Sequence, residues 1–292
     1  MSDFVEEETR PVPVVRRFLR DRGALASVVV LLLLLVGSLL ASWLVPDKAT
    51  QTSGSLHRPP SAGHLLGTDE LGRDLAARLL IGAQASVVVA FASALLGMAI
   101  GVAAGLVGGY VGRWWDSVLM RVMDLLLALP MVLVALVVVV VLGPSTLNVV
   151  IAIAVAAVPT FARLARAGVL ELRDRQFVLA AKAMGAGSVD IMTRTVLPNI
   201  MGPIIVQFVV VAASAVVAAA SLSFLGLGVP PPAPSWGSML QQSQSYLFDN
   251  AWYGVFPGLA LALTVLCLDR IGVGLQRVLG SSGAADIAVE VR

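Results

Sequence analysis

The sequence has few charged residues and a single cysteine. Only 13% of its 292 residues are charged, against about 25% in a typical soluble domain, and 58% are hydrophobic. The net charge of +2 is too small and too scattered for a surface that binds nucleic acid. Cys267 is alone, which excludes an internal disulfide, and its apolar surroundings predict a thiol packed in the core. The composition indicates an integral membrane protein.

Residues that commonly carry catalysis are scarce as well. A phosphate-binding loop of the Walker type needs glycine followed by lysine, but the two lysines follow Asp47 and Ala181. Both histidines, His57 and His64, lie in one hydrophilic stretch, so the sequence lacks a nucleophile–histidine pair and a two-histidine metal helix. We predict that the chain is not an enzyme and holds no catalytic residue, cofactor or metal.

Long uncharged runs predict six membrane-spanning helices. Residues 24–45 carry no charge, and a helix of this length measures about 33 Å, which matches a bilayer core of about 30 Å. A cleavable signal peptide has a shorter apolar region of about 7–15 residues, so we expect an anchor that stays in the membrane. The other spans are predicted over residues 79–112, 125–162 as a hairpin of two, 199–223 and 250–268. The expected fold is all-α and polytopic.

Prolines and glycines mark where these helices should end or bend. Gly-Pro-Ser at residues 143–145 predicts the turn between the third and fourth spans, and Pro130 and Pro159 should kink or end those helices. The four prolines between residues 230 and 234 predict an extended, polyproline-like segment. Residues 239–248 are expected to form a helix on the outer surface.

Residues 46–78 form a hydrophilic stretch rich in turn-forming residues. Gly67, Gly72 and Asp74 supply turn and helix-cap chemistry. A metal site is an alternative, with His57, His64, Asp69, Glu70 and Asp74 as candidate ligands. Their spacing matches no known set of metal ligands, which favours a solvated loop.

Four glycines recur at intervals of four residues in the second predicted span. Gly97, Gly101, Gly105 and Gly109 share one helical face, where they would let another helix pack backbone to backbone. A glycine hinge that bends during gating is the alternative, and the two roles are compatible.

The longest charged interval between two apolar runs covers residues 163–198. Within it, Phe177, Ala180, Ala181 and Met184 stand at positions i, i+3, i+4 and i+7, which predicts one apolar face of a helix.

Two glycines and a serine predict a turn after this helix. Gly185 should end the helix, Gly187 should free the turn, and Ser188 should cap a second short helix with Asp190 in its first turn. A helix-turn-helix this apolar on an aqueous face needs a partner to cover it. A helix lying on the membrane surface is the alternative.

The residues of this interval resemble the cytoplasmic coupling loop of permeases in bacterial ATP-driven (ABC) importers. The resemblance rests on Leu179-Ala180-Ala181, on Gly185, and on the run Thr195 to Pro198. The family usually has Glu where Leu179 stands and Ile where Thr195 stands. Two further strings, residues 66–74 and 223–240, are similar to loops of dipeptide and oligopeptide permeases.

The resemblance implies a type I ABC importer permease fold and the role of the second permease of a peptide importer. In this family the short helix docks into a cleft of a separate ATPase subunit. The residues thereby implied in ATPase coupling are Phe177, Leu179, Ala180, Ala181, Met184, Gly185, Ala186, Gly187 and Ser188. The implied partners are a homologous second permease, two ATPase subunits that bind ATP and Mg, an extracytoplasmic substrate-binding protein and membrane lipid.

Other substrates and other classes remain as alternatives. Relatives with this architecture import nickel complexes, glutathione or haem. A secondary transporter would place ionisable groups in mid-membrane, whereas the predicted spans are uncharged apart from Asp124 and Asp269 near the inner edge. A haem-bearing redox subunit would need histidine ligands within the spans, where the sequence has none.

The distribution of basic residues predicts the orientation. With the N-terminus in the cytoplasm, sixteen of the twenty basic residues fall on the inner side. We therefore expect a multi-pass protein of the bacterial plasma membrane with both termini cytoplasmic. Residues 1–23 should form a tail and a basic interfacial helix, 24–279 the permease domain with its coupling loop at 163–198, and 280–292 a cytoplasmic tail.

Overall fold

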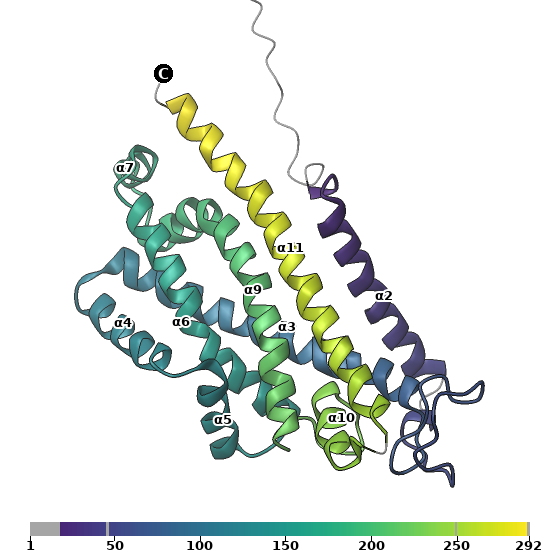
Figure 1. Ribbon diagram of the computed structural model, residues 1–292. Helices are drawn as coiled ribbons and strands as arrows, with labels where there is room; N and C mark the ends of the chain where they lie inside the picture. The colour runs from purple at the N-terminus through teal and green to yellow at the C-terminus, as the bar shows by residue number, and fades with distance from the viewer. Residues whose placement is uncertain (1–17, 45–46, 249, 291–292) are drawn as a thin grey trace, which may run out of the picture.

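The chain folds into a bundle of long α-helices (Figure 1). The computed structural model describes residues 18–44, 47–248 and 250–290. The long helices are α2 (Arg22–Leu44), α3 (Leu75–Val111), α6 (Thr146–Leu172), α9 (Leu197–Phe224) and α11 (Trp252–Glu290). The shorter ones are α4 (Arg113–Leu127), α5 (Met131–Leu142), α7 (Gln176–Ala183), α8 (Ser188–Asp190) and α10 (Trp236–Ser243). The all-α expectation is confirmed.

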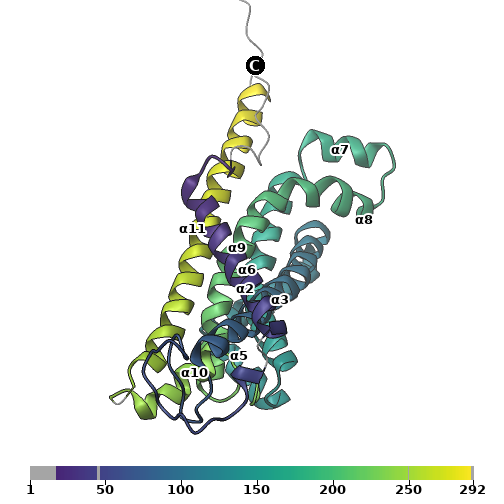
Figure 2. The ribbon, with the colours of Figure 1, turned by 90° about the vertical axis from the view of Figure 1, so that its right-hand side faces the viewer.

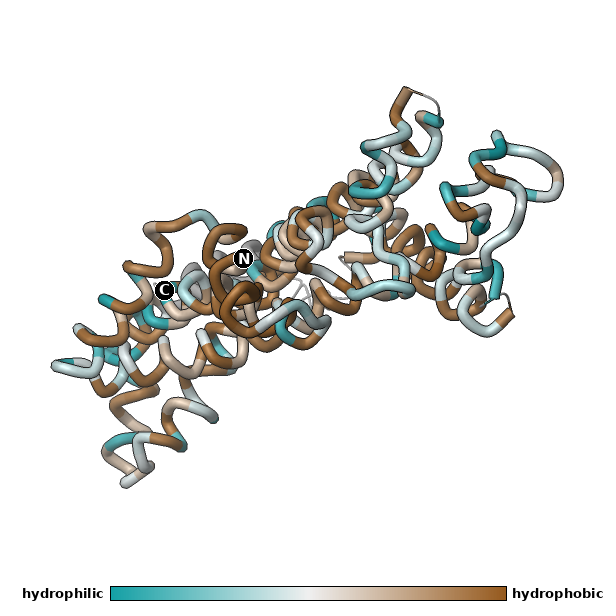
Figure 3. The backbone as a smooth tube through the Cα atoms, turned by 90° about the horizontal axis from the view of Figure 1, so that it is seen from below, coloured by the Kyte–Doolittle hydropathy of each residue, from teal (hydrophilic) through white to brown (hydrophobic). Residues whose placement is uncertain are grey.

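The bundle has two distinct ends. Figures 1 and 2 show α7 at the same end as the C-terminal part of α11 and the beginning of α2. The loop between α2 and α3 lies with α10 at the opposite end. Figure 3 shows apolar residues along most helices and hydrophilic residues gathered in that loop. We refer to these as the α7 end and the α10 end.

The membrane-spanning helices agree with those predicted from the sequence, and the third crossing contains a break. Within the described residues, five helices are long and apolar enough to span a bilayer: Arg22–Leu44, Leu75–Val111, Thr146–Leu172, Ser188–Phe224 and Trp252–Leu279. The sixth crossing is a pair, because α4 and α5 meet at 96° across a short break that ends at Pro130. The prediction that Pro130 kinks or ends a helix of the 125–162 run is confirmed. The 12 residues of α5 extend only about 18 Å.

Side-chain caps explain where three of the long helices begin. Asp74 caps α3, as predicted, and accepts a hydrogen bond of 2.9 Å from the Ala77 backbone N–H. Ser145 caps α6 in the same way, and Asp21 caps α2. α3 begins four residues before the predicted span, so Arg78 belongs to the helix. Pro159 lies inside α6 without ending it.

The glycine row of α3 faces α6 at very short range. A Cβ placed on Gly97 would lie 2.9 Å from the Ala157 Cβ, and one placed on Gly101 would lie 2.7 Å from the Phe161 Cβ. Gly105 and Gly109 meet the next two turns of α6 equally closely. Any side chain on this face would force the two helices apart, because real Cβ atoms do not approach other atoms at these distances.

The loop between α2 and α3 is largely exposed over residues 50–65, as predicted for a solvated loop, but it also contains a buried group of charges that was not predicted. Arg73 donates from Nε to Asp69 Oδ2 at 2.7 Å, and Arg78 Nε lies 3.3 Å from the same oxygen. Asp69, Arg73 and Arg78 are 0%, 7% and 1% exposed. Arg73 Nη2 also pairs with Glu70 Oε1 at 3.0 Å, so two carboxylates balance the two buried guanidinium groups. We call Asp69, Arg73 and Arg78 the Asp69 cluster.

Arg78 extends the Asp69 cluster to elements near the other end of the chain. Its Nη1 donates to the Ala49 carbonyl oxygen at 3.0 Å, and its Nη2 donates to Gln242 Oε1 at 3.3 Å. The Tyr253 hydroxyl donates to the same Gln242 oxygen at 2.8 Å. The loop, the beginning of α3, α10 and the beginning of α11 are thereby held together.

Two further expectations at the α10 end need correction. The proline-rich segment turns at residues 231–233 instead of extending as a polyproline helix. The helix that follows begins at Trp236 and is packed into the protein, because Trp236 and Met239 are fully buried against Leu75 and Tyr253. The Trp236 indole N–H donates to the Leu79 carbonyl oxygen at 2.9 Å. The position of α10 is therefore set by its packing against residues close to the Asp69 cluster.

Some predicted segments lie outside the described residues. These are the N-terminal tail and the first residues of the predicted interfacial helix, including Arg16 and Arg17, which fall within residues 1–17. The described remainder is not a separate helix, because Leu19 and Arg20 form a turn and Arg22 already begins α2. At the other end of the chain, α11 continues beyond residue 279 to Glu290.

Candidate functional site

The charged interval forms an elbow at the α7 end of the bundle. α6 leads into α7, a turn leads into α8, and a π-helical turn at Ile191–Val196 leads into α9. Figure 2 shows α7 and α8 projecting from the side of the bundle. We call residues 176–190 the elbow.

Gly185 makes the turn of the elbow, as predicted. Its φ of +85° lies in the left-handed region that glycine adopts at little cost. The Gly185 N–H donates to the Lys182 carbonyl at 3.0 Å, and the Ala186 N–H donates to the Ala181 carbonyl at 3.1 Å. This pair of bonds is a Schellman motif, which satisfies the last carbonyls of α7.

The elbow exposes most of its apolar side chains. Phe177 is 44% exposed, Met184 is 82% exposed and Val189 is 69% exposed. Ala180 shares the exposed face with Phe177 and Met184, in agreement with the predicted spacing. Ala181 departs from the prediction, because it turns inward and packs against the core. The outer surface of the elbow is therefore narrower than the sequence indicated, but still apolar.

Two contacts hold the elbow on the long helices. Val178 is fully buried in a cluster that also contains Val169 of α6 and Ile191 at the beginning of the π-helical turn. Lys182 Nζ lies 5.4 Å from the centroid of the Tyr110 ring near the end of α3, which is a cation–π geometry. α7 is therefore held against α3, α6 and the π-helical turn that leads into α9.

Two details of the elbow differ from the prediction or were not predicted. Gly187 occupies the N-cap position of α8, and Ser188 is the first helical residue without a capping hydrogen bond from its side chain. The π-helical turn closes with a bond from the Leu197 N–H to the Met192 carbonyl. Such turns are rare and often lie at functional sites. None of the sequence patterns used above predicts it.

Ion pairs fix α4 against α6 near the elbow. Arg166 donates from Nε and Nη2 to the two carboxylate oxygens of Asp116, at 2.5 and 2.7 Å. Arg163 pairs with Asp124 at 2.6 Å, although both side chains are about half exposed. The bidentate pair fixes geometry as well as charge.

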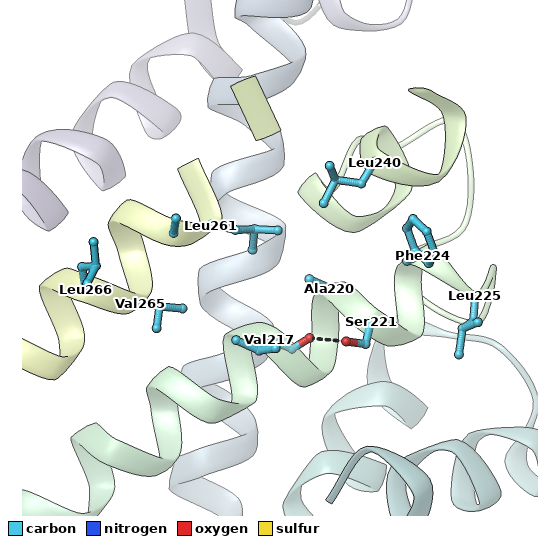
Figure 4. A pocket seen from close by; sticks show the side chains of 10 residues that line it. Val217, Ala220, Ser221, Phe224, Leu225, Leu240, Leu261, Val265 and Leu266 are labelled. Carbon is cyan, nitrogen blue, oxygen red and sulfur yellow. Dashed lines mark hydrogen bonds between the residues drawn. The ribbon is translucent and has the colours of Figure 1, made fainter. Parts of the chain in front are cut away.

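A second candidate site is an open apolar groove of about 740 Å³ between α9 and α11 (Figure 4). Val217 and Phe224 line it from α9, Leu240 from α10 and Leu261 from α11. Ser221 is its hydroxyl-bearing residue, and that hydroxyl donates to the Val217 carbonyl at 2.8 Å. The groove therefore offers mainly apolar contact surface.

The candidate metal ligands of the α2–α3 loop do not come together. His64 Nδ1 lies 2.9 Å from Asp74 Oδ2, while Asp69 is occupied by two arginines. In the part of the chain that the structure describes, no group of three His, Cys, Asp or Glu side chains is placed to hold a metal.

Comparison with known proteins agrees with this geometry. Residues 97–281 match the family described as "Binding-protein-dependent transport system inner membrane component". Residues 13–60 match the family described as "N-terminal TM domain of oligopeptide transport permease C". The first match includes the glycine row, the elbow and the groove.

Curated relatives cover nearly the whole chain. A Brucella abortus biovar 1 protein named as a peptide transport system permease is 42% identical over 269 residues, which are 90% of this chain and 89% of the relative. The glutathione transport system permease protein GsiD of Escherichia coli O157:H7 is 41% identical over 266 residues, which are 90% of this chain and 88% of the relative.

A solved structure shows the same fold. It is the MetNI methionine ABC transporter in an inward-facing conformation, which aligns with a TM-score of 0.57 and 19% identity over 69% of this chain and 96% of that chain. Together with the family match over residues 97–281, these likenesses establish that the chain belongs to the binding-protein-dependent transport system inner membrane components, the permeases of ABC importers.

Proposed function

We propose that the chain is the second permease of an importer that moves dipeptides or oligopeptides across the bacterial plasma membrane. The match of residues 13–60 to oligopeptide permease C and the name of the Brucella relative support a peptide substrate. The observation that carries the proposal is the elbow, whose apolar surface is exposed at the α7 end and anchored to α3, α6 and the π-helical turn. Glutathione is the second candidate substrate, because GsiD is about equally similar.

The proposed partners follow from the exposed surfaces. Two ATPase subunits bind ATP and Mg, and one of them covers Phe177, Ala180 and Met184. A homologous second permease faces this chain across the membrane, and the apolar groove between α9 and α11 offers a surface for that contact or for the transport path. A substrate-binding protein delivers the substrate at the α10 end. Chemistry on ATP is left to the partners, so this chain contributes no catalytic residue.

The mechanism is mechanical coupling. ATP draws the two ATPase subunits together, and each pulls the elbow that it holds. Because Val178 and Lys182 tie α7 to α3, α6 and the π-helical turn, the pull moves long helices as rigid bodies and opens the path outward. Hydrolysis and product release reverse the movement.

The orientation of the chain in the membrane can be tested by labelling single added cysteines, because the natural cysteine contributes little signal. Cys267 is buried, so an added cysteine will be the main accessible thiol. Met184 at the elbow is 82% exposed, and Leu65 in the α2–α3 loop is 73% exposed. With the termini in the cytoplasm, an impermeant maleimide is expected to label Leu65→Cys in intact spheroplasts and to label Met184→Cys only after lysis. Labelling of Met184→Cys from outside would reverse the proposed topology.

The docking of the elbow can be tested by asking whether the ATPase subunits protect the thiol of Met184→Cys from labelling. Met184→Cys in membranes is expected to lose most of its reactivity when the ATPase subunits are co-expressed, whereas Leu65→Cys is expected to stay reactive. Equal labelling of Met184→Cys with and without the ATPase subunits would show that they do not cover the elbow.

Gly185→Asn is expected to uncouple ATP turnover from uptake while leaving the fold intact. Asparagine tolerates the left-handed backbone, and a Cβ at Gly185 meets nothing within 4 Å in this chain. Its side chain would fill space that the ATPase cleft is proposed to occupy. In proteoliposomes of the whole complex, we expect uptake to fall at least about tenfold, which corresponds to roughly 1.4 kcal/mol of lost coupling.

Gly226→Asn is the matched control for this substitution. Gly226 ends α9 with the same pair of Schellman hydrogen bonds and a φ of +79°, and a Cβ there would have Gln241 Nε2 as its nearest neighbour at 3.5 Å, but it lies at the α10 end. We expect this variant to retain uptake. Normal uptake by Gly185→Asn, or equal loss in both variants, would contradict the docking role of the elbow.

A further inference from the structure

A basic cavity lies at the α7 end, where the first turn of α2 meets α11. Its volume is about 600 Å³, and Arg20, Arg22 and Arg277 line it together with Asp21, Gly23 and Gly274. A Cβ on Gly274 would lie 2.7 Å from the Ala24 Cβ, so α2 and α11 are in close contact at this point. The cavity is therefore built by both ends of the described chain.

The charges around the cavity do not cancel. Arg277 Nη1 pairs with Asp21 Oδ2 at 3.0 Å. The hydrogen bond from the Ala24 backbone N–H, with Gly23 and Arg277 adding to it, holds the pKa of Asp21 below its usual range, so Asp21 is ionised. Neither Arg20 nor Arg22 forms an ion pair with any described residue. Three arginines against one aspartate leave two positive charges for a ligand.

The position of the cavity along α2 matches the depth of lipid headgroups. α2 has 23 residues and is about 34 Å long, close to the thickness of a bilayer core of about 30 Å. Its uncharged run begins at Gly23, directly after Arg22. A basic residue at this boundary meets the phosphate layer of the membrane.

An apolar stripe continues from the cavity along the exposed face of α2. Val29, Leu33, Val36 and Leu40 follow Arg22 at helical spacing, and all five side chains are exposed. A phospholipid has the same order of groups, with a charged head followed by an apolar chain. A soluble anion would use the arginines alone.

We propose that this cavity binds the phosphate headgroup of an anionic phospholipid, whose acyl chain lies along the Arg22–Leu40 stripe. Arginine suits this ligand because its planar guanidinium can donate two parallel hydrogen bonds to phosphate oxygens. Bound lipid would join the first and last spans of the chain at their cytoplasmic ends.

The test compares lipids retained by the full chain. The protein is reconstituted in nanodiscs of equal parts phosphatidylglycerol and phosphatidylcholine, and the lipids that stay bound are counted by native mass spectrometry. We expect wild type to retain phosphatidylglycerol in preference. In Arg20→Gln/Arg22→Gln the preference for phosphatidylglycerol should fall about 30-fold, because each of the two basic residues near an anionic surface contributes roughly a factor of five. Cys267 is expected to stay unreactive toward a thiol reagent in both proteins, which would show that the fold is intact.

A matched variant separates the cavity from general surface charge. Arg113→Gln/Arg121→Gln removes two exposed arginines that lie outside the cavity and is expected to keep the wild-type preference. A wild type without preference, an equal loss in both double variants, or an unchanged Arg20→Gln/Arg22→Gln would overturn the proposal. Displacement of the lipid by excess inorganic phosphate would also overturn it, because a soluble anion would then suffice.

Discussion

Gly105→Leu is expected to prevent the chain from keeping its native fold, with a loss of about 3 kcal/mol or more in the free energy of unfolding. A Cβ on Gly105 would already lie 2.8 Å from the Ala165 Cβ and 2.9 Å from the Arg166 backbone nitrogen. Backbone atoms cannot move aside locally, so α3 and α6 must separate. Since Gly97, Gly101 and Gly109 contact the same helix, dispersion contacts are lost along four turns.

A neighbouring glycine provides the control for this substitution. A Cβ on Gly108 would have its nearest neighbour, Asp116 Oδ1, at 3.4 Å. Gly108→Ala is therefore expected to be neutral or to stabilise by about 0.5–1 kcal/mol, whereas Gly105→Ala is expected to cost about 1–3 kcal/mol. The stability of both variants can be measured by heating them in detergent and following the reaction of the buried Cys267 with a thiol dye. Equal midpoints for the two alanine variants would rule out tight packing at Gly105.

Asp69→Asn is expected to lower the free energy of unfolding by about 3–5 kcal/mol, because it leaves the buried Arg78 without a counter-charge and leaves Arg73 with Glu70 alone. Arg73 and Arg78 are 7% and 1% exposed and share the Asp69 carboxylate. The same carboxylate accepts hydrogen bonds from the backbone N–H groups of Leu71 and Arg73. The α2–α3 loop should therefore detach from α10, which protease cleavage of the loop in detergent-solubilised protein would detect.

An exposed ion pair serves as the comparison. Arg163 and Asp124 approach to 2.6 Å, closer than Asp69 and Arg73, but their side chains are 54% and 55% exposed. Asp124→Asn is expected to cost less than about 1 kcal/mol, because water solvates both charges. Asp69→Asn/Arg78→Met should recover part of the loss caused by Asp69→Asn alone, since one unpaired charge is removed. A cost for Asp69→Asn as small as that for Asp124→Asn would refute the importance of the cluster.

The elbow was largely predictable because its signals are local. Gly185 is placed by the left-handed turn that a Schellman motif needs, and neighbouring residues alone determine that geometry. The spacing of Phe177, Ala180 and Met184 likewise reflects a single helix. Ala181 was assigned to the wrong face because the packing partner of α7, the end of α6 with the π-helical turn, is set by tertiary structure.

The errors concern contacts between residues far apart in the chain. Composition predicted the exposed part of residues 46–78 but not its buried charges, since sequence alone does not reveal that Asp69 and Glu70 balance Arg73 and Arg78 and that Gln242 completes the group. The bend between α4 and α5 has a visible cause in Pro130, but a proline does not specify an angle of 96°. The groove between α9 and α11 was not predicted, because apolar residues occupy every side of those helices.

The distance in sequence between Arg78 and Gln242 also sets an order for biogenesis. The two residues are 164 positions apart, so a ribosome working at about 5–20 residues per second needs roughly 8–33 s to reach the second after the first. During that interval Asp69, made just before Arg78, is the carboxylate that allows the arginine to leave water. The ion pairs around Asp69 therefore precede the bond to Gln242, and the α10 end of the bundle is closed only late in synthesis.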